Sequence, residues 1–150
     1  MPVLIADSSA LVRAYLDDEI DHEMFRSLLL VERNVVLATQ HSVVEVSRAF
    51  AAARRVRRMS GLTIERIGEE FQAAIGREKR FRLISLDPGP TLSRAVELVE
   101  QYPLGTLDAI HLAVADREGR ALAGDDELVF VTADVAQGQA ATALGMTVRP

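Results

Sequence analysis

The sequence predicts an α/β fold, a Rossmann-like three-layer sandwich around a central parallel sheet of four to five strands. Short apolar runs alternate along the whole chain with longer segments of helical periodicity, which is typical of this class. The short runs are apolar at consecutive positions, as expected for strands buried on both faces of a parallel sheet. Helix-capping residues or Gly and Pro breaks separate the two kinds of segment.

Each element is assigned from its own local pattern. The apolar runs place strands at residues 2–6, 35–38, 83–86, 128–132 and 146–148. Helical spacing places helices at residues 10–16, 21–32, 40–57, 63–79, 91–101, 106–119 and 134–144. Thr39 and Thr106 are expected to cap two of these helices. Ser60 and Gly61 break the chain between helices 40–57 and 63–79, so these two helices are predicted to form a protruding hairpin.

Composition limits the possible classes of protein. The 150 residues suit one domain, residues 1–150, and 49% hydrophobic residues are enough to build a core. The absence of cysteine excludes disulfides, thiolate zinc sites and a cysteine nucleophile. No apolar run approaches the roughly 20 residues that span a bilayer. Asp7 and Arg13 interrupt the first apolar stretch, which excludes a signal peptide, so we expect a cytoplasmic protein without membrane contact.

The charges are unevenly distributed along the chain. The net charge is −5, which by itself argues against nucleic-acid binding. Between Arg48 and Arg82, however, ten basic residues stand against four acids, a net charge of +6. The remainder of the chain therefore carries −11. Such asymmetry indicates a polyanion contact beside an acidic site, although a basic helix end exposed to solvent has the same signature.

Four acids lie just after expected strands or near the start of the helices that follow them: Asp7, Glu45, Asp108 and Asp134. In an open parallel sheet, ligands bind beyond the carboxyl ends of the strands, so these acids are expected at one rim. Each has a plain structural explanation, because acids cap helices and favour their first turn. Glu45 and Asp108 have largely apolar neighbours, however, and partly desolvated carboxylates need a partner. Oxygen-only ligation of this kind suits Mg²⁺ or Mn²⁺, and phosphodiester hydrolysis is the chemistry that uses it.

The motifs around these acids resemble the PIN-domain family and, within it, the VapC-type toxins of toxin–antitoxin pairs. The matching segments are residues 7–12 (DSSALV), Glu45 in a VVEV helix start, residues 107–113 (LDAIHLA) and residues 130–134 (FVTAD). They occur in the family's order and cover nearly the whole chain. The resemblance implies a PIN-like version of the predicted sandwich and an endoribonuclease that depends on Mg²⁺ or Mn²⁺.

The resemblance also implies roles for individual residues. Asp7, Glu45 and Asp108 would ligate the metal, and Asp134 would complete the catalytic pocket. Ser9 and Thr132 match hydroxyl residues that orient carboxylates or waters in such sites. Asp126 is the reserve candidate should Asp134 point away. His111 lies one helical turn from Asp108, where it could stabilise a phosphate or donate a proton.

Partners follow from charge and from the resemblance. The basic residues near the end of helix 40–57 are expected to contact RNA phosphates, because an acidic pocket cannot attract RNA unaided; they are Arg54, Arg55, Arg57 and Arg58. The resemblance adds a cognate antitoxin on the helical hairpin and a homodimer. Two alternatives remain open: a PIN-domain RNA-processing nuclease without a toxin role, and a catalytically silent RNA-binding module.

Overall fold

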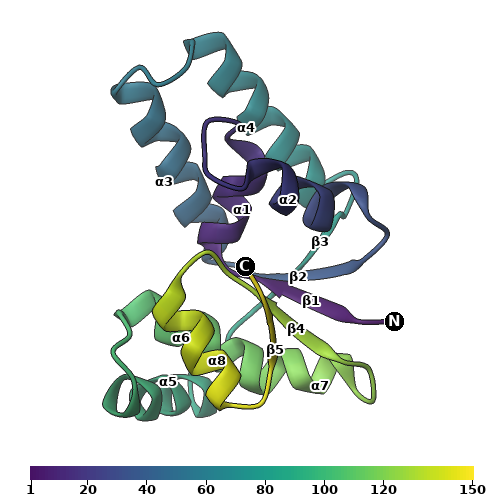
Figure 1. The fold of residues 1–150 in the computed structure, drawn as a ribbon, viewed down its shortest axis with the longest axis vertical. Coiled ribbons are helices and arrows are strands. Elements are labelled where there is room, and N and C mark those ends of the chain that lie inside the picture. Colours follow the sequence, from purple (N-terminus) through teal and green to yellow (C-terminus); the bar gives the residue numbers. More distant parts are fainter.

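A single parallel sheet forms the centre of the computed structural model, which describes all 150 residues. Its strands are β1 (Val3–Ala6), β2 (Val35–Thr39), β3 (Phe81–Ile84), β4 (Leu128–Val131) and β5 (Thr147–Arg149). They are ordered β3-β2-β1-β4-β5, and every neighbouring pair is parallel. The predicted fold class is therefore confirmed (Figure 1).

Helices cover both faces of the sheet (Figure 1). One layer contains α1 (Ser8–Tyr15), α2 (His22–Arg26), α3 (Ser42–Arg55) and α4 (Gly61–Ile75). The other contains α5 (Pro90–Gln101), α6 (Thr106–Val114), α7 (Arg120–Ala123) and α8 (Val135–Ala143). The α3–α4 hairpin extends away from the sheet as predicted. None of the helices combines the length and the apolar character needed to cross a lipid bilayer.

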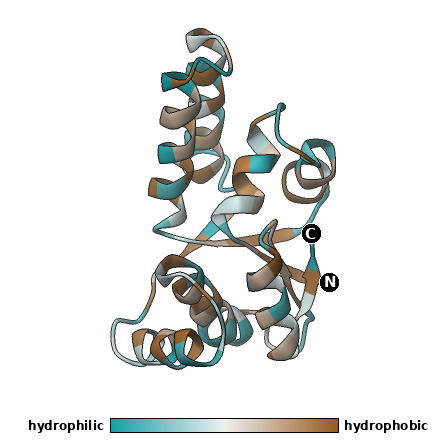
Figure 2. Cartoon of the chain, turned by 60° about the vertical axis from the view of Figure 1, so that its left-hand side comes forward, coloured by the Kyte–Doolittle hydropathy of each residue, from teal (hydrophilic) through white to brown (hydrophobic).

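Alternation along the strands builds two separate cores. Leu4 and Ala6 of β1 pack into the layer of α1–α4, whereas Val3 and Ile5 pack into the layer of α5–α8. Consecutive strand residues point to opposite faces, so a strand covered on both sides must be apolar throughout. Figure 2 shows the strands in mostly apolar colours between the two helical layers.

An aromatic cluster anchors the hairpin to the body. Phe71 of α4 is 2% exposed and packs edge-on against Tyr15 of α1 and Phe50 of α3, with ring centroids 5.3 and 5.9 Å away. Such pairs add about 0.5–1.5 kcal/mol beyond the burial of their area. The base of the hairpin is thus fixed, while its tip lies out in solvent.

Several helix boundaries differ from the prediction. Thr39 belongs to β2 rather than capping α3, and Gly105 rather than Thr106 precedes α6. Ser60 caps α4, since its hydroxyl accepts a hydrogen bond from the Thr63 amide. Helix 21–32 divides into α2 and a π-helical turn, Ser27–Val31.

Helical structure also continues past Gly119, through the π-helical turn Ala115–Gly119 into α7. A Cβ at Gly119 would lie 3.4 Å from Leu128 Cδ2 and 3.6 Å from Ile5 Cδ1. These are ordinary van der Waals distances, so the packing of the helix on the sheet does not require a glycine there, and Gly119 does not end the helix.

Candidate active site

The four predicted acids lie at the carboxyl edge of the sheet, on four different elements. Asp7 caps α1 directly after β1, and Asp134 caps α8 after β4. Glu45 and Asp108 lie in the first turns of α3 and α6. The chain order reverses at β1, which has β2 on one side and β4 on the other. Such a reversal opens the crevice in which α/β sheets bind their ligands.

Asp7 is a buried carboxylate that accepts several hydrogen bonds. It is 3% exposed and accepts hydrogen bonds from the Ala10 amide at 2.9 Å and from the hydroxyls of Ser9 and Thr132, both at 2.7 Å. Burial raises the pKa of Asp7 above its usual range, although these hydrogen bonds act in the opposite direction. The two hydroxyl residues of the prediction thus both contact the first acid.

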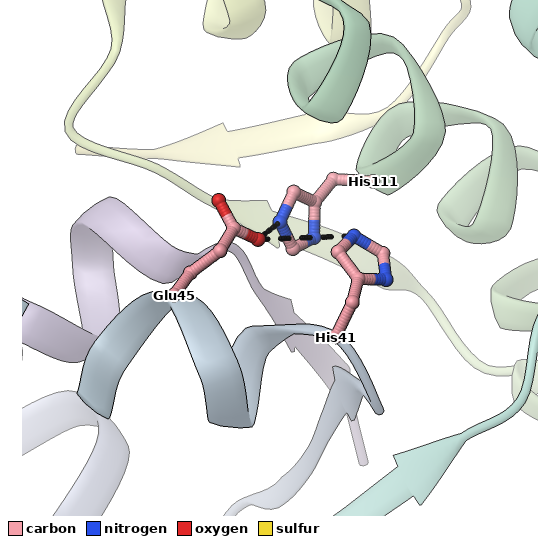
Figure 3. Close-up of side chains that lie close together, drawn as sticks. All are labelled: His41, Glu45 and His111. Atoms are coloured by element: carbon pink, nitrogen blue, oxygen red, sulfur yellow. Dashed lines mark hydrogen bonds and ion pairs between the residues drawn. The ribbon is translucent and has the colours of Figure 1, made fainter. Parts of the chain in front are cut away.

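Glu45 is held by a buried histidine (Figure 3). The Glu45 Oε1 atom lies 2.6 Å from His111 Nε2. Because a carboxylate only accepts hydrogen bonds, this Nε2–H is the donor. The other ring nitrogen of His111 lies 3.1 Å from Thr39 Oγ1, and Ser8 Oγ lies 3.0 Å from Nε2. The 2% exposed ring therefore connects β2, α1 and α6 to the carboxylate of α3.

Burial raises the pKa of Glu45, but the hydrogen bond and the charge of His111 outweigh it, so the pKa is lower than usual. His41 lies beside this pair, with its ring centroid 4.3 Å from that of His111. Burial, reinforced by the charge of His111, lowers the pKa of His41 to about 4. Glu45 therefore stays ionised next to a neutral His41.

Asp108 is the acid most affected by its acidic neighbours. Its pKa is raised by partial burial, then by the charges of Asp134 and, more weakly, Glu45. Gln137 lies between this pair and the first acid: its side-chain amide donates to the Asp108 carbonyl, and its Oε1 lies 3.1 Å from the Thr132 hydroxyl that donates to Asp7. The repulsion between these carboxylates is the kind that a divalent cation relieves.

The donor chemistry of this edge fits a hard divalent cation. Carboxylate oxygens are the preferred ligands of Mg²⁺ and Mn²⁺, and here they come with hydroxyl groups that orient them. His41, Glu45 and His111 are the one trio of acidic or imidazole side chains whose ligand atoms lie within 4.8 Å of one another. Both ring nitrogens of His111 already take part in hydrogen bonds, so this trio acts as a support for Glu45. Asp7, Asp108 and Asp134 belong to no such trio.

Not every predicted residue reaches the edge. Asp126 pairs with the terminal amine of Met1 at 3.0 Å and precedes β4, at the opposite end of that strand. Its role as a reserve ligand is therefore wrong, because parallel strands put their amino ends on the other side of the sheet.

The four predicted RNA-binding arginines are exposed near the end of α3. Arg58 is engaged within the protein, since its guanidinium donates to both carboxylate oxygens of Asp18 at 2.8 and 2.7 Å and to Glu19 at 2.9 Å. It ties the hairpin to the loop after α1. Arg54, Arg55 and Arg57 form no ion pair within the chain.

Comparison with known proteins decides the family. The PIN-domain family model matches residues 4–137. The chain is a member of the PIN-domain family. No curated protein matches this PIN domain.

Solved structures share the fold of this PIN domain at low sequence identity. VapC20 of Mycobacterium tuberculosis is 18% identical, covers 98% of this chain and 99% of its own, and has a TM-score of 0.65. PAE2754 of Pyrobaculum aerophilum is 18% identical over 97% of this chain and 83% of its own, with a TM-score of 0.65. VapBC2 of Rickettsia felis is 12% identical over 99% and 98%, with a TM-score of 0.63.

Some residues of the PIN-domain site have only weak signals in the sequence. The spacing of three residues places His111 near Asp108. It does not predict the contacts of His111 with Thr39 and Ser8, which lie on other elements. A pocket beside Glu45 has two arginine side chains in its wall, Arg13 and Arg48. Arg48 lies one turn from Glu45, a spacing that indicates a shared helix face.

Proposed function

We propose that this PIN domain is an endoribonuclease that depends on Mg²⁺ or Mn²⁺ and serves as the toxin of a toxin–antitoxin pair. The observation that carries the proposal is the set of acids at the carboxyl edge, with a raised pKa at Asp108 next to Asp134 and Glu45. Asp7 and Glu45 accept hydrogen bonds, but the Asp108 carboxylate accepts none that would offset the repulsion, and a carboxylate perturbed in this way is typical of a functional site.

The proposal assigns Asp7, Glu45, Asp108 and Asp134 to the cation. When bound, the cation lowers the pKa of an attacking water and offsets charge on the phosphodiester. The side chains of the protein hold these carboxylates in place: Ser9 and Thr132 fix Asp7, and His111 fixes Glu45. In-line attack by water leaves a 5′-phosphate and a 3′-hydroxyl.

The toxin role is supported by the kinds of protein that share the fold. VapC20 is described as a toxin that cleaves the sarcin–ricin loop, and VapBC2 was solved on a DNA fragment from its promoter. A further similar structure is a toxin–antitoxin complex from Klebsiella pneumoniae, with a TM-score of 0.55 at 17% identity. By the same reasoning we propose a cognate antitoxin and a homodimer as partners.

The α3–α4 hairpin offers a place for the antitoxin. A groove of about 1090 Å³ lies between these helices, and its lining includes apolar residues (Phe50, Ile64, Phe71) and charged residues of both signs (Arg54, Arg55, Arg77, Glu65, Glu69). Apolar contact area inside a rim of charge suits a protein partner.

A defined RNA tests the nuclease. We expect cleavage by the wild type with Mg²⁺ or Mn²⁺ but not with EDTA, and a loss of about 100-fold or more in Asp108→Asn. Asp125→Asn, in an exposed loop, is the control and should cleave like the wild type. Wild-type rates in Asp108→Asn would reject the site, and absence of cleavage by the wild type would favour the silent binding module.

Growth separates the toxin from an RNA-processing nuclease. Induced expression of the wild type should arrest growth of its host, and Asp108→Asn should not. Cleavage of RNA without growth arrest would support the nuclease function and contradict the toxin role.

A further inference from the structure

A small pocket adjoins the acidic edge on the side of α1 and α3. Its volume is about 370 Å³, at the lower end of the roughly 300–1,000 Å³ of pockets that hold small molecules. Glu45, Ser8 and Ser9 line it and connect it to the acidic edge, because Glu45 is one of the four acids and the Ser9 hydroxyl donates to Asp7. Arg13 and Arg48 line it as well, together with Val12, Glu19 and Leu107.

The two arginines give this pocket a cationic wall. Arg48 is exposed and forms no ion pair within the chain. Arg13 is held at one end, because its Nη1 donates to the Ile20 carbonyl at 3.3 Å, and its side chain is 27% exposed. Since a guanidinium carries five N–H donors, most of those on Arg13 remain available.

The acids of the same pocket are already compensated. Glu19 accepts a hydrogen bond from Arg58 at 2.9 Å, and Glu45 accepts one from His111 at 2.6 Å. Arg48 therefore has no charged partner within the chain, and Arg13 has only a long ion pair, from its Nη1 to Asp21 Oδ2 at 3.9 Å. A phosphate group is the anion that a pair of guanidinium forks fits best.

Arg48 also connects this pocket to the cations of the hairpin. It follows Glu45 by three residues, a rise of about 4.5 Å along α3. Arg55 follows Arg48 by seven residues, about 10.5 Å further along nearly the same face of the helix. A chain of phosphates that starts at the acidic edge thus meets cations in succession.

Resting on the proposed nuclease function, we propose that this pocket binds the nucleotide next to the scissile bond, with Arg13 and Arg48 holding its phosphate. Leu107, 46% exposed, and Val12 supply an apolar surface for the sugar or base. In this proposal the two arginines position the substrate, and the four acids remain the catalytic residues.

The test combines a protein variant with a substrate variant. An RNA oligonucleotide cut by the wild type is remade with a neutral methylphosphonate at the linkage on one side of the cut or the other. Wild type, Arg48→Ala and Arg13→Ala are compared by kcat/KM with Mn²⁺. Arg33→Ala is the matched control, because Arg33 is exposed, forms no ion pair and precedes β2 at the opposite edge of the sheet.

On the charged RNA we expect Arg48→Ala to lose about tenfold or more in kcat/KM, while Arg33→Ala cleaves like the wild type. At one of the two linkages, the methylphosphonate should lower the kcat/KM of the wild type by a similar factor. The same substitution should hardly change the kcat/KM of Arg48→Ala, which has already lost the contact. Circular dichroism of each variant checks the fold. The Arg48→Lys variant should recover part of the loss, because it restores the charge without the fork.

If the arginine substitution and the methylphosphonate lower kcat/KM by independent factors that multiply at both linkages, the proposed subsite is wrong. The proposed nuclease function would not be affected by that result. Wild-type kcat/KM in both Arg48→Ala and Arg13→Ala would lead to the same conclusion. Absence of cleavage by the wild type, in contrast, would overturn the nuclease function and with it the subsite.

Discussion

Replacing Asp7 with Asn removes a buried negative charge while keeping the shape of the side chain. The carboxylate is 3% exposed, and burial raises its pKa despite the donors around it. The network can accept an amide. Its oxygen would take the Ala10 and Ser9 hydrogen bonds, and its nitrogen would donate to Thr132 Oγ1. The Thr132 proton would then turn to Gln137 Oε1, already 3.1 Å away.

In EDTA at pH 7, we expect Asp7→Asn to be more stable than the wild type, by about 1.4 kcal/mol for each pH unit that separates 3.8 from the higher pKa of Asp7 in the folded protein. The sign follows from linkage. A folded-state pKa above the ordinary 3.8 means that the ionised carboxylate destabilises the fold at neutral pH. The difference between the two proteins should shrink as the pH falls toward 3.8. Urea denaturation at several pH values measures it.

Adding metal should change the comparison. At Mn²⁺ concentrations about 100 times the dissociation constant, the wild type should gain about 2.7 kcal/mol in unfolding free energy, and the variant much less. If Asp7→Asn is less stable than the wild type in EDTA, the reasoning about the buried charge is refuted. An equal gain from Mn²⁺ in both proteins would remove Asp7 from the cation site.

Three further predictions concern the surrounding structure. His111→Gln should lose about 1–3 kcal/mol of stability and raise the Mn²⁺ concentration for half-maximal cleavage about tenfold or more, because it cannot hold Glu45 in the same way; an unchanged metal requirement would restrict the ring to a structural role. Phe71→Ala should cost about 3–5 kcal/mol in urea denaturation, against about 0.5 kcal/mol or less for Leu62→Ala, which is 80% exposed. Folding lowers the pKa of His41 from 6.5 to about 4, so on acidification this side chain takes up a proton in the unfolded protein at a higher pH than in the folded protein. In EDTA, the wild type should therefore lose stability relative to His41→Gln as the pH falls from 6.5 toward 4, and parallel pH curves would contradict this.

The sheet was predictable because its central strands are short, almost entirely apolar and separated by strong breaks. The edge strands were harder to place, because β3 contains Arg82 and β5 contains Thr147 and Arg149, and the strand predicted at residues 83–86 overlaps β3 only at residues 83–84. The helix boundaries were also less predictable, because caps depend on which hydroxyl meets an amide in space. Thr39 has the right residue type for a cap, yet its hydroxyl lies 2.8 Å from Ser42 Oγ and 3.1 Å from His111. Gly119 is a residue type that often ends a helix, but the backbone stays helical there and continues into α7.

The placement of the acids at one edge was predictable once the strands were taken to be parallel, since parallel strands align their carboxyl ends. What supports the acids was harder to predict, because the partners are remote in sequence. Glu45 and His111 are separated by 66 residues. The pairing of Arg58 with Asp18 and Glu19 likewise depends on how a loop folds back onto α3, which no local pattern encodes.

Cleavage of a total-RNA pool, with the cut ends mapped, tests the central claim most directly. The purified wild type is incubated with the pool with and without Mn²⁺, beside Asp7→Asn. We predict cuts only in the wild type with Mn²⁺, at ends carrying a 5′-phosphate and a 3′-hydroxyl. Cuts that persist without metal or in Asp7→Asn, or ends with 2′,3′-cyclic phosphates, would contradict a cation-dependent site built on these acids.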